Sequence, residues 1–163
     1  SAGMGKHEEL VETYAAHYLN PNNRHMRLFP DVPPTLERLR EAGYWLSVAT
    51  GKGRSGLNQA IAQTGTGDFW LATACASECP SKPAPDMVWR LCDELGVMPS
   101  ESIVIGDTAF DLEMAAHAGA RGIGVATGAH SRETLQSAPN IGILSCFGEL
   151  EGFLQRQGSI EAV

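Results

Sequence analysis

The sequence lacks several features that mark particular classes of protein. It has four cysteines in 163 residues and no Cys-x-x-Cys pair, which argues against a zinc ribbon or a disulfide framework. Cys75 and Cys92 lie in apolar patterns and are expected to be reduced core residues. No apolar run approaches the roughly 18 residues of a membrane span, and no secretory signal is recognisable, so we expect a cytoplasmic protein with no membrane partner.

Positive charge is also scarce. Lys and Arg number 12 against 19 Asp and Glu, the net charge is -7, and no basic block appears, so nucleic acid is not an expected partner. The chain is 43% hydrophobic and 19% charged, which is a globular composition. Its length fits one domain with a proper core.

Short apolar runs alternate with helical patterns along most of the chain. This alternation predicts an α/β fold with a parallel sheet and helices on both faces. In such sheets, ligand-binding and catalytic residues lie beyond the carboxyl ends of the strands. Strands are expected over residues 44–49, 69–74, 103–105, 123–126 and 141–144. Helices are expected over residues 6–19, 33–42, 55–63, 86–95, 110–118 and 149–155.

Two carboxylates follow the apolar run at residues 102–105. Asp107 is expected at the strand tip and Asp111 in the first turn of the next helix. Two hard oxygen ligands so placed suit Mg²⁺, which completes its octahedron with waters and phosphate oxygens. A simpler interpretation is that Asp107 caps the helix and Asp111 favours its positive end.

Other candidate residues stand at the same expected edge. Thr50 ends the strand at 44–49, so its hydroxyl and the amide of Gly51 could donate to a phosphate oxygen, although a turn threonine is the commoner case. Lys82 lies in a turn held by Pro83 and Pro85, where a surface lysine is the plainer interpretation. Lys52 is a rival cation that ranks lower, because it is expected to point along the loop toward solvent.

The three motifs follow one another along the chain in this order: a strand-end Thr-Gly, a Lys-Pro-x-Pro, and an apolar-Gly-Asp-Thr-x-x-Asp. This order resembles the last three motifs of the haloacid dehalogenase superfamily. Residues 28–32 resemble the exit from the helical cap of its phosphoglycolate-phosphatase-like branch, and the resemblance covers about residues 5–155. It implies a Rossmann-like three-layer core and a Mg²⁺-dependent phosphatase acting on a small phosphorylated metabolite.

The resemblance also implies roles for individual residues. Thr50 and Gly51 would bind the phosphoryl group, and Lys82 would stabilise negative charge on the nucleophile and the phosphoryl oxygens. Asp107 would bind Mg²⁺, with Asp111 as a ligand or as a residue that holds the site. These roles agree with the logic of phosphoryl transfer, in which positioning and charge stabilisation dominate.

The sequence departs from the family at the first motif, an Asp-x-Asp-x-Thr whose first aspartate is the nucleophile. The one aspartate before Thr50 is Asp31, which lies in a Pro-rich turn. We therefore expect an N-terminally truncated member that is inactive alone. Residues 1–27 would be a tag remnant, the last cap helix and a linker. Residues 28–163 would be an incomplete core lacking the family's first central strand.

A missing central strand would leave two strands with unpaired edges. Either these strands pair directly or another segment fills the gap, and homo-oligomers could form through the N-terminal helix or the exposed central strands. Other readings stay open: a non-catalytic metal- and phosphate-binding fragment or regulatory domain, and a phosphosugar mutase or dehalogenase of the same superfamily. A response-regulator receiver is disfavoured, because its acidic residues come first and its lysine last. His130, in the loop after residues 123–126 and near the expected mouth of the site, is expected to face solvent rather than to act as an acid or base.

Overall fold

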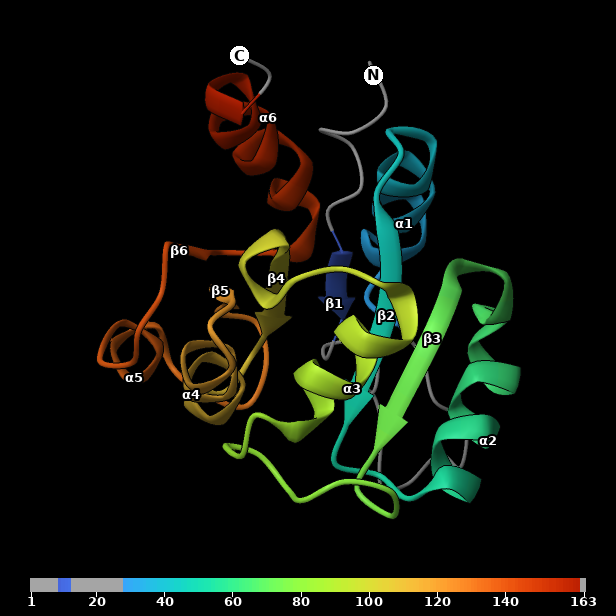
Figure 1. Ribbon diagram of the computed structural model, residues 1–163. Helices are drawn as coiled ribbons and strands as arrows, with labels where there is room; N and C mark the ends of the chain where they lie inside the picture. The colour runs from blue at the N-terminus through green and yellow to red at the C-terminus, as the bar shows by residue number, and fades with distance from the viewer. Residues whose placement is uncertain (1–8, 13–27, 162–163) are drawn as a thin grey trace.

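The computed structural model describes residues 9–12 and 28–161, and the side chains of residues 28–157. These residues form a six-stranded parallel sheet in the order β3-β2-β1-β4-β5-β6, with helices on both faces (Figure 1). The predicted three-layer α/β class is confirmed. The strands are β1 (Glu9–Glu12), β2 (Trp45–Thr50), β3 (Trp70–Cys75), β4 (Ser102–Gly106), β5 (Arg121–Val125) and β6 (Gly142–Leu144).

The helices follow the predicted alternation closely. They are α1 (Val32–Glu41), α2 (Arg54–Thr64), α3 (Asp86–Leu95), α4 (Ala109–Ala118), α5 (Arg132–Gln136) and α6 (Leu150–Glu161). Three short 3-10 turns accompany them: η3 (Gly67–Phe69), η4 (Pro99–Glu101) and η5 (Phe147–Glu149). The helix α5 was not predicted from the sequence, because its five residues are too few to show a helical period.

The N-terminal segment corrects one prediction. A helix was expected over residues 6–19, but Glu9–Glu12 form β1, which pairs in parallel with both β2 and β4. The rest of the expected helix and linker lies outside the described residues. The open edges of β2 and β4 explain the outcome, because satisfying two rows of backbone groups outweighs a weak helical pattern.

The strand β1 also settles how the expected gap is filled. The central position between β2 and β4 is occupied by a segment of the chain itself, so the expectation of a core without a central strand is wrong in this respect. Self-association through exposed central strands therefore loses its basis, since both strand edges are paired.

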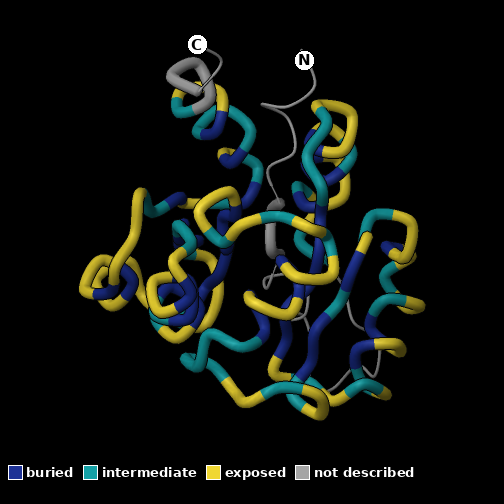
Figure 2. The backbone as a smooth tube through the Cα atoms, viewed as in Figure 1, coloured by how far each residue is buried: buried dark blue, intermediate teal, exposed yellow. Residues whose placement is uncertain are grey.

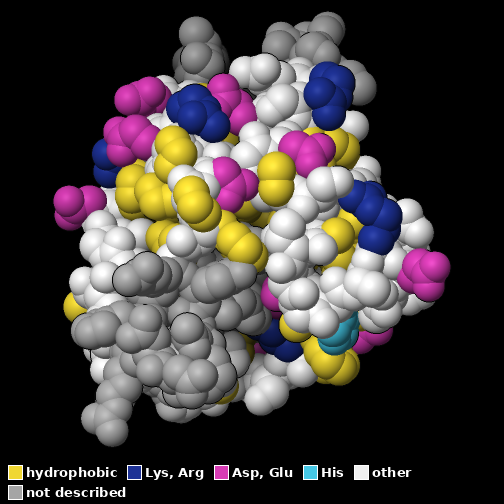
Figure 3. Space-filling view, turned by 180° about the vertical axis from the view of Figure 1, so that it is seen from behind, with side chains coloured by type: hydrophobic (Ala, Val, Ile, Leu, Met, Phe, Trp, Pro, Cys, Tyr) yellow, Lys and Arg dark blue, Asp and Glu magenta, His cyan; other side chains and the backbone are white. Residues whose placement is uncertain are grey.

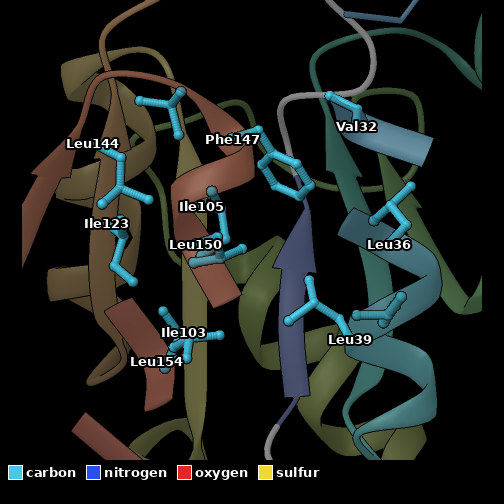
Figure 4. Close-up of a cluster of buried hydrophobic side chains, with 12 residues drawn as sticks. Val32, Leu36, Leu39, Ile103, Ile105, Ile123, Leu144, Phe147, Leu150 and Leu154 are labelled. Atoms are coloured by element: carbon cyan, nitrogen blue, oxygen red, sulfur yellow. The ribbon is translucent and has the colours of Figure 1, made fainter. Parts of the chain in front are cut away.

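The two largest apolar clusters of the described residues pack the helices against the sheet. Figure 2 shows the buried backbone of the central strands between the helices. On one face, α1 and α6 pack on β2, β4, β5 and β6, as Figure 4 shows for Leu36 and Leu39 of α1 and for Leu150 and Leu154 of α6. On the other face, α3 and α4 pack on alanines and a valine of β2, β3 and β4. Alternate residues of each central strand serve opposite faces, as Ile103 and Ile105 against Val104 do in β4.

All strand pairs are parallel, so the carboxyl ends of the strands share one edge of the sheet. The register fixes which residues are level there. Glu12 of β1 pairs with Val48 of β2 and with Ile105 of β4. Thr50 and Asp107 each follow two residues later, so they lie level on either side of β1.

No helix among the described residues is long and apolar enough to cross a membrane. On the face seen in Figure 3, acidic and basic side chains are interspersed among apolar ones, and the described residues show no broad basic patch there.

Candidate functional site

The turn from β4 into α4 places two carboxylates in the interior. Asp107 follows the fully buried strand β4 and has 0% exposure, while Asp111 has 1%. Gly106 permits this approach, because a Cβ built there would lie 2.3 Å from Cβ of Asp111. The two acidic residues predicted from sequence are therefore together and shielded from water, where charge must be balanced by nearby groups.

The helix cap differs from the simpler interpretation of the sequence. The cap of α4 is Thr108 rather than Asp107: its Oγ1 accepts a hydrogen bond from the Asp111 amide at 3.2 Å. Oδ2 of Asp111 in turn accepts from the amide of Thr108 at 3.2 Å and from its hydroxyl at 2.8 Å. This reciprocal capping box fixes the Asp111 carboxylate and leaves Asp107 out of the cap.

Lys82 supplies the balancing charge. Its Nζ lies 2.7 Å from Oδ1 of Asp111, and its side chain is 13% exposed. The turn that carries it is closed by a hydrogen bond from the Ala84 amide to Ser81 O, at 3.0 Å. The Pro83 carbonyl lies 2.9 Å from Nδ1 of His117, on the last turn of α4. The lysine is thus a nearly buried cation, contrary to the surface-lysine interpretation.

Thr50 ends β2 and is 3% exposed. Its Oγ1 accepts a hydrogen bond from the Lys52 amide at 3.2 Å, which leaves the hydroxyl proton available to donate. Gly51 is exposed, and a Cβ there would meet no atom within 4 Å. The Lys52 stem lies against Gly56 of α2, with its Cβ 3.6 Å from a Cβ built at that glycine.

The loop after β5, which the sequence places at the same edge of the sheet, contributes backbone donors to the site. The Ala129 amide donates to Oδ2 of Asp107 at 2.9 Å, and the His130 amide donates to the Asp107 carbonyl at 3.1 Å. A Cβ at Gly128 would lie only 1.9 Å from Oδ2 of Asp107, so this position must be glycine for the carboxylate to stay in place. The only sequence signal was a glycine just after a strand end.

His130 corrects a second expectation. It was expected to face solvent, but it is only partly exposed, and its Nδ1 accepts a hydrogen bond from the Ala109 amide at 2.9 Å. Its ring also lies against Phe110, with centroids 5.7 Å apart and planes tilted by 60°. Nothing in the local sequence pairs this loop with the start of α4, since the contact depends on the order of β4 and β5 in the sheet.

A polar network flanks the site at the end of β3. The Arg54 guanidinium donates to Glu78 at 2.6 Å and to Oγ1 of Thr73 at 2.8 Å. The hydrogen bond from Arg54 holds the pKa of the Glu78 carboxyl below its ordinary value, and the same bond raises the pKa of Arg54. The network joins the start of α2 to the loop after β3.

The chemistry of these donors suits a magnesium ion with few protein ligands. Mg²⁺ is commonly held by one or two carboxylates, with waters and substrate phosphate completing its shell. Both oxygens of Asp111 are already engaged, by Lys82 on one side and by Thr108 on the other. Among the residues that the structure describes, no group of three or more His, Cys, Asp or Glu could hold a metal ion.

Comparison with known proteins places these features in a family. The family model described as haloacid dehalogenase-like hydrolase matches residues 2–147. The chain is 30% identical over 133 residues to the pyrophosphatase PpaX of Bacillus velezensis, covering 81% of this chain and 62% of that protein. It is 31% identical over 116 residues to a phosphoglycolate phosphatase of Aquifex aeolicus, covering 70% and 54%.

Structural similarity agrees with the sequence matches. The crystal structure of a protein described as a predicted phosphoglycolate phosphatase from Haemophilus somnus has a TM-score of 0.74 and 26% identity, covering 79% of this chain and 58% of that one. The chain therefore spans little more than half the length of the relatives it matches.

Proposed function

The chain belongs to the haloacid dehalogenase-like hydrolase family, and from that premise we propose that it carries the metal- and phosphate-binding half of a magnesium-dependent phosphatase site. The substrate class would be small phosphate monoesters. The observation that carries the proposal is the ion pair of 2.7 Å between Lys82 and Asp111, beside the buried Asp107, at the carboxyl edge of the sheet. The named relatives, a pyrophosphatase and phosphoglycolate phosphatases, support the same chemistry.

The proposed roles follow from the contacts of each side chain. Asp107 would bind Mg²⁺ directly. Asp111 would hold Lys82 and the first turn of α4, because its Oδ1 forms the ion pair with Lys82 and its Oδ2 accepts hydrogen bonds from Thr108. A magnesium ion there would neutralise charge on a phosphoryl group. Thr50 would donate its hydroxyl proton to a phosphoryl oxygen, and the Gly51 amide would add a second donor.

We also propose that the chain binds phosphate without turning over its esters. Covalent hydrolysis of the family type needs a carboxylate nucleophile level with Thr50 and Asp107, at the end of the central strand. In the sequence, Glu12 ends β1 and is followed by Thr13 and Tyr14, so no aspartate stands there. Loss of a covalent nucleophile costs many orders of magnitude in rate.

Isothermal titration tests the binding part of the proposal. We expect the wild-type chain to bind Mg²⁺, and inorganic phosphate to bind more tightly in its presence. The variant D107N should lose Mg²⁺ binding, because it removes the proposed ligand charge. The variant D93N is the matched control, since Asp93 is an exposed carboxylate on α3 and its loss should leave binding unchanged.

A p-nitrophenyl phosphate assay tests the absence of turnover. The wild-type rate should equal that of D107N. A wild-type rate that D107N abolishes would support the phosphatase site and overturn the claim that the chain is inactive. Absence of Mg²⁺ binding by the wild-type chain would overturn the proposed site itself.

A further inference from the structure

The start of α4 is held from a distance by one histidine. The first amides of a helix have no partner within the helix and need acceptors from outside it. Thr108 satisfies the amide of Asp111. The amide of Ala109, the first residue of α4, donates instead to Nδ1 of His130 at 2.9 Å, from a loop beyond β5.

The same loop also binds the other side of the turn. The His130 amide donates to the Asp107 carbonyl at 3.1 Å, and the neighbouring Ala129 amide donates to Oδ2 of Asp107 at 2.9 Å. His130 therefore bridges the residue before the turn and the residue that begins the helix. The turn from Asp107 to Asp111 cannot shift without breaking one of these bonds.

The chemistry required of residue 130 is specific. An imidazole that accepts at Nδ1 carries its proton at Nε2, so the contact needs a hydrogen-bond acceptor at the Nδ1 position. The ring packing against Phe110 sets the orientation of that acceptor. An asparagine can place its side-chain oxygen near the same point, because Oδ1 and the Nδ1 of histidine are both bonded to Cγ, whereas the oxygen of glutamine lies one bond further from the backbone.

We propose that His130 is a positioning residue for the magnesium site, acting through the Ala109 amide and the Asp107 backbone. This inference rests on the proposed function only in that Mg²⁺ is the ion Asp107 would bind. His130 acts through its neighbours and does not itself bind the ion. Outer residues that orient a metal ligand commonly contribute on the order of tenfold or more to metal affinity.

The test compares Mg²⁺ affinity, measured by isothermal titration, among substitutions at position 130. We expect H130A to weaken binding about tenfold. H130N should recover most of the affinity, because it keeps an acceptor for the Ala109 amide, and H130Q should resemble H130A. The matched control is S131A in the same loop. It removes the side-chain cap of α5, in which Ser131 Oγ accepts from the Thr134 amide at 3.2 Å. It leaves in place the donors and acceptors that Ala129 and His130 supply to Asp107 and Ala109.

Amide hydrogen exchange at Ala109 supplies a second readout that does not depend on the metal. Protection there should fall in H130A and persist in H130N and S131A. If H130A binds Mg²⁺ with the same affinity as the wild-type chain does, the positioning role alone is overturned. Equal weakening by H130A and H130N would overturn the acceptor mechanism. No Mg²⁺ binding by the wild-type chain would overturn the proposed function and this inference with it.

Discussion

The variant K82M isolates the energetic role of the lysine. Methionine keeps most of the aliphatic stem but removes the ammonium that lies 2.7 Å from Oδ1 of Asp111. The Asp111 carboxylate, 1% exposed, would then be a buried charge without its cation. Breaking a buried ion pair by removing one partner costs about 3–5 kcal/mol. That is a large share of the roughly 5–15 kcal/mol by which a native domain is stable.

The double variant K82M/D111N tells whether the charge is the cause. Asparagine removes the unpaired negative charge. Its side-chain oxygen can still accept the hydrogen bonds that Thr108 donates to Oδ2 of Asp111 in the wild-type chain. We therefore expect the double variant to be more stable than K82M, by about 2 kcal/mol or more, since only the penalty of an unpaired buried charge has been removed.

The assay is urea unfolding followed by circular dichroism, in the presence of EDTA so that no metal replaces the lysine charge. The control is R40M, because Arg40 and Glu37 form an ion pair of 2.8 Å with both side chains more than 40% exposed. Such a pair contributes about 1 kcal/mol or less. A loss in K82M no larger than in R40M, or strictly additive effects of K82M and D111N, would refute the reasoning.

Three further substitutions, at Gly128, Gly56 and Glu78, test contacts around the site. G128A should lower both stability, by about 1–3 kcal/mol, and Mg²⁺ affinity in titration, because its Cβ would lie 1.9 Å from Oδ2 of Asp107. G56A in α2 should instead stabilise the chain by about 0.5–1 kcal/mol, and a similar gain in G128A would contradict the close approach. Arg54 holds the pKa of Glu78 below its ordinary value of 4.5, so stability from Glu78 is present above that pH and lost as the pH falls through the lower folded-state value. The urea midpoint of E78Q should lie below wild type at pH 7 and converge with it in acid, and a gap that is constant with pH would count against the ion pair.

Most of the sheet could be predicted because its buried strands are short, mainly apolar runs. The segment Leu46-Ser47-Val48-Ala49 and the segment Ile103-Val104-Ile105 are covered on both faces, so they carry no polar alternation and stand out from the helices between them. The segment Glu9–Glu12 gives no such signal. Its state is decided by the edges of β2 and β4, which lie far away in the sequence.

Some features of the candidate site could likewise be predicted from the sequence and others could not. Thr50, Lys82, Asp107 and Asp111 could be selected because each follows a strand or lies in a recognisable turn, and the structure brings the lysine and the second aspartate into contact. Gly128 and His130 could be placed at the same edge of the sheet, but their contacts could not be predicted, because these depend on how closely the loop after β5 approaches Asp107. Sequence spacing carries no measure of that approach.

The central place of β1 has a consequence for the order of folding. Leu10 pairs with Leu46 on one side and with Ile103 on the other, so among the described strands the backbone pairing of the two halves of the sheet is continuous through β1. The unit of β2 and β3 and the unit of β4 to β6 can each assemble from neighbours in sequence, whereas their union requires the ends of a long loop to close. Backbone pairing between the β2–β3 unit and the β4–β6 unit therefore depends on four residues, Glu9–Glu12.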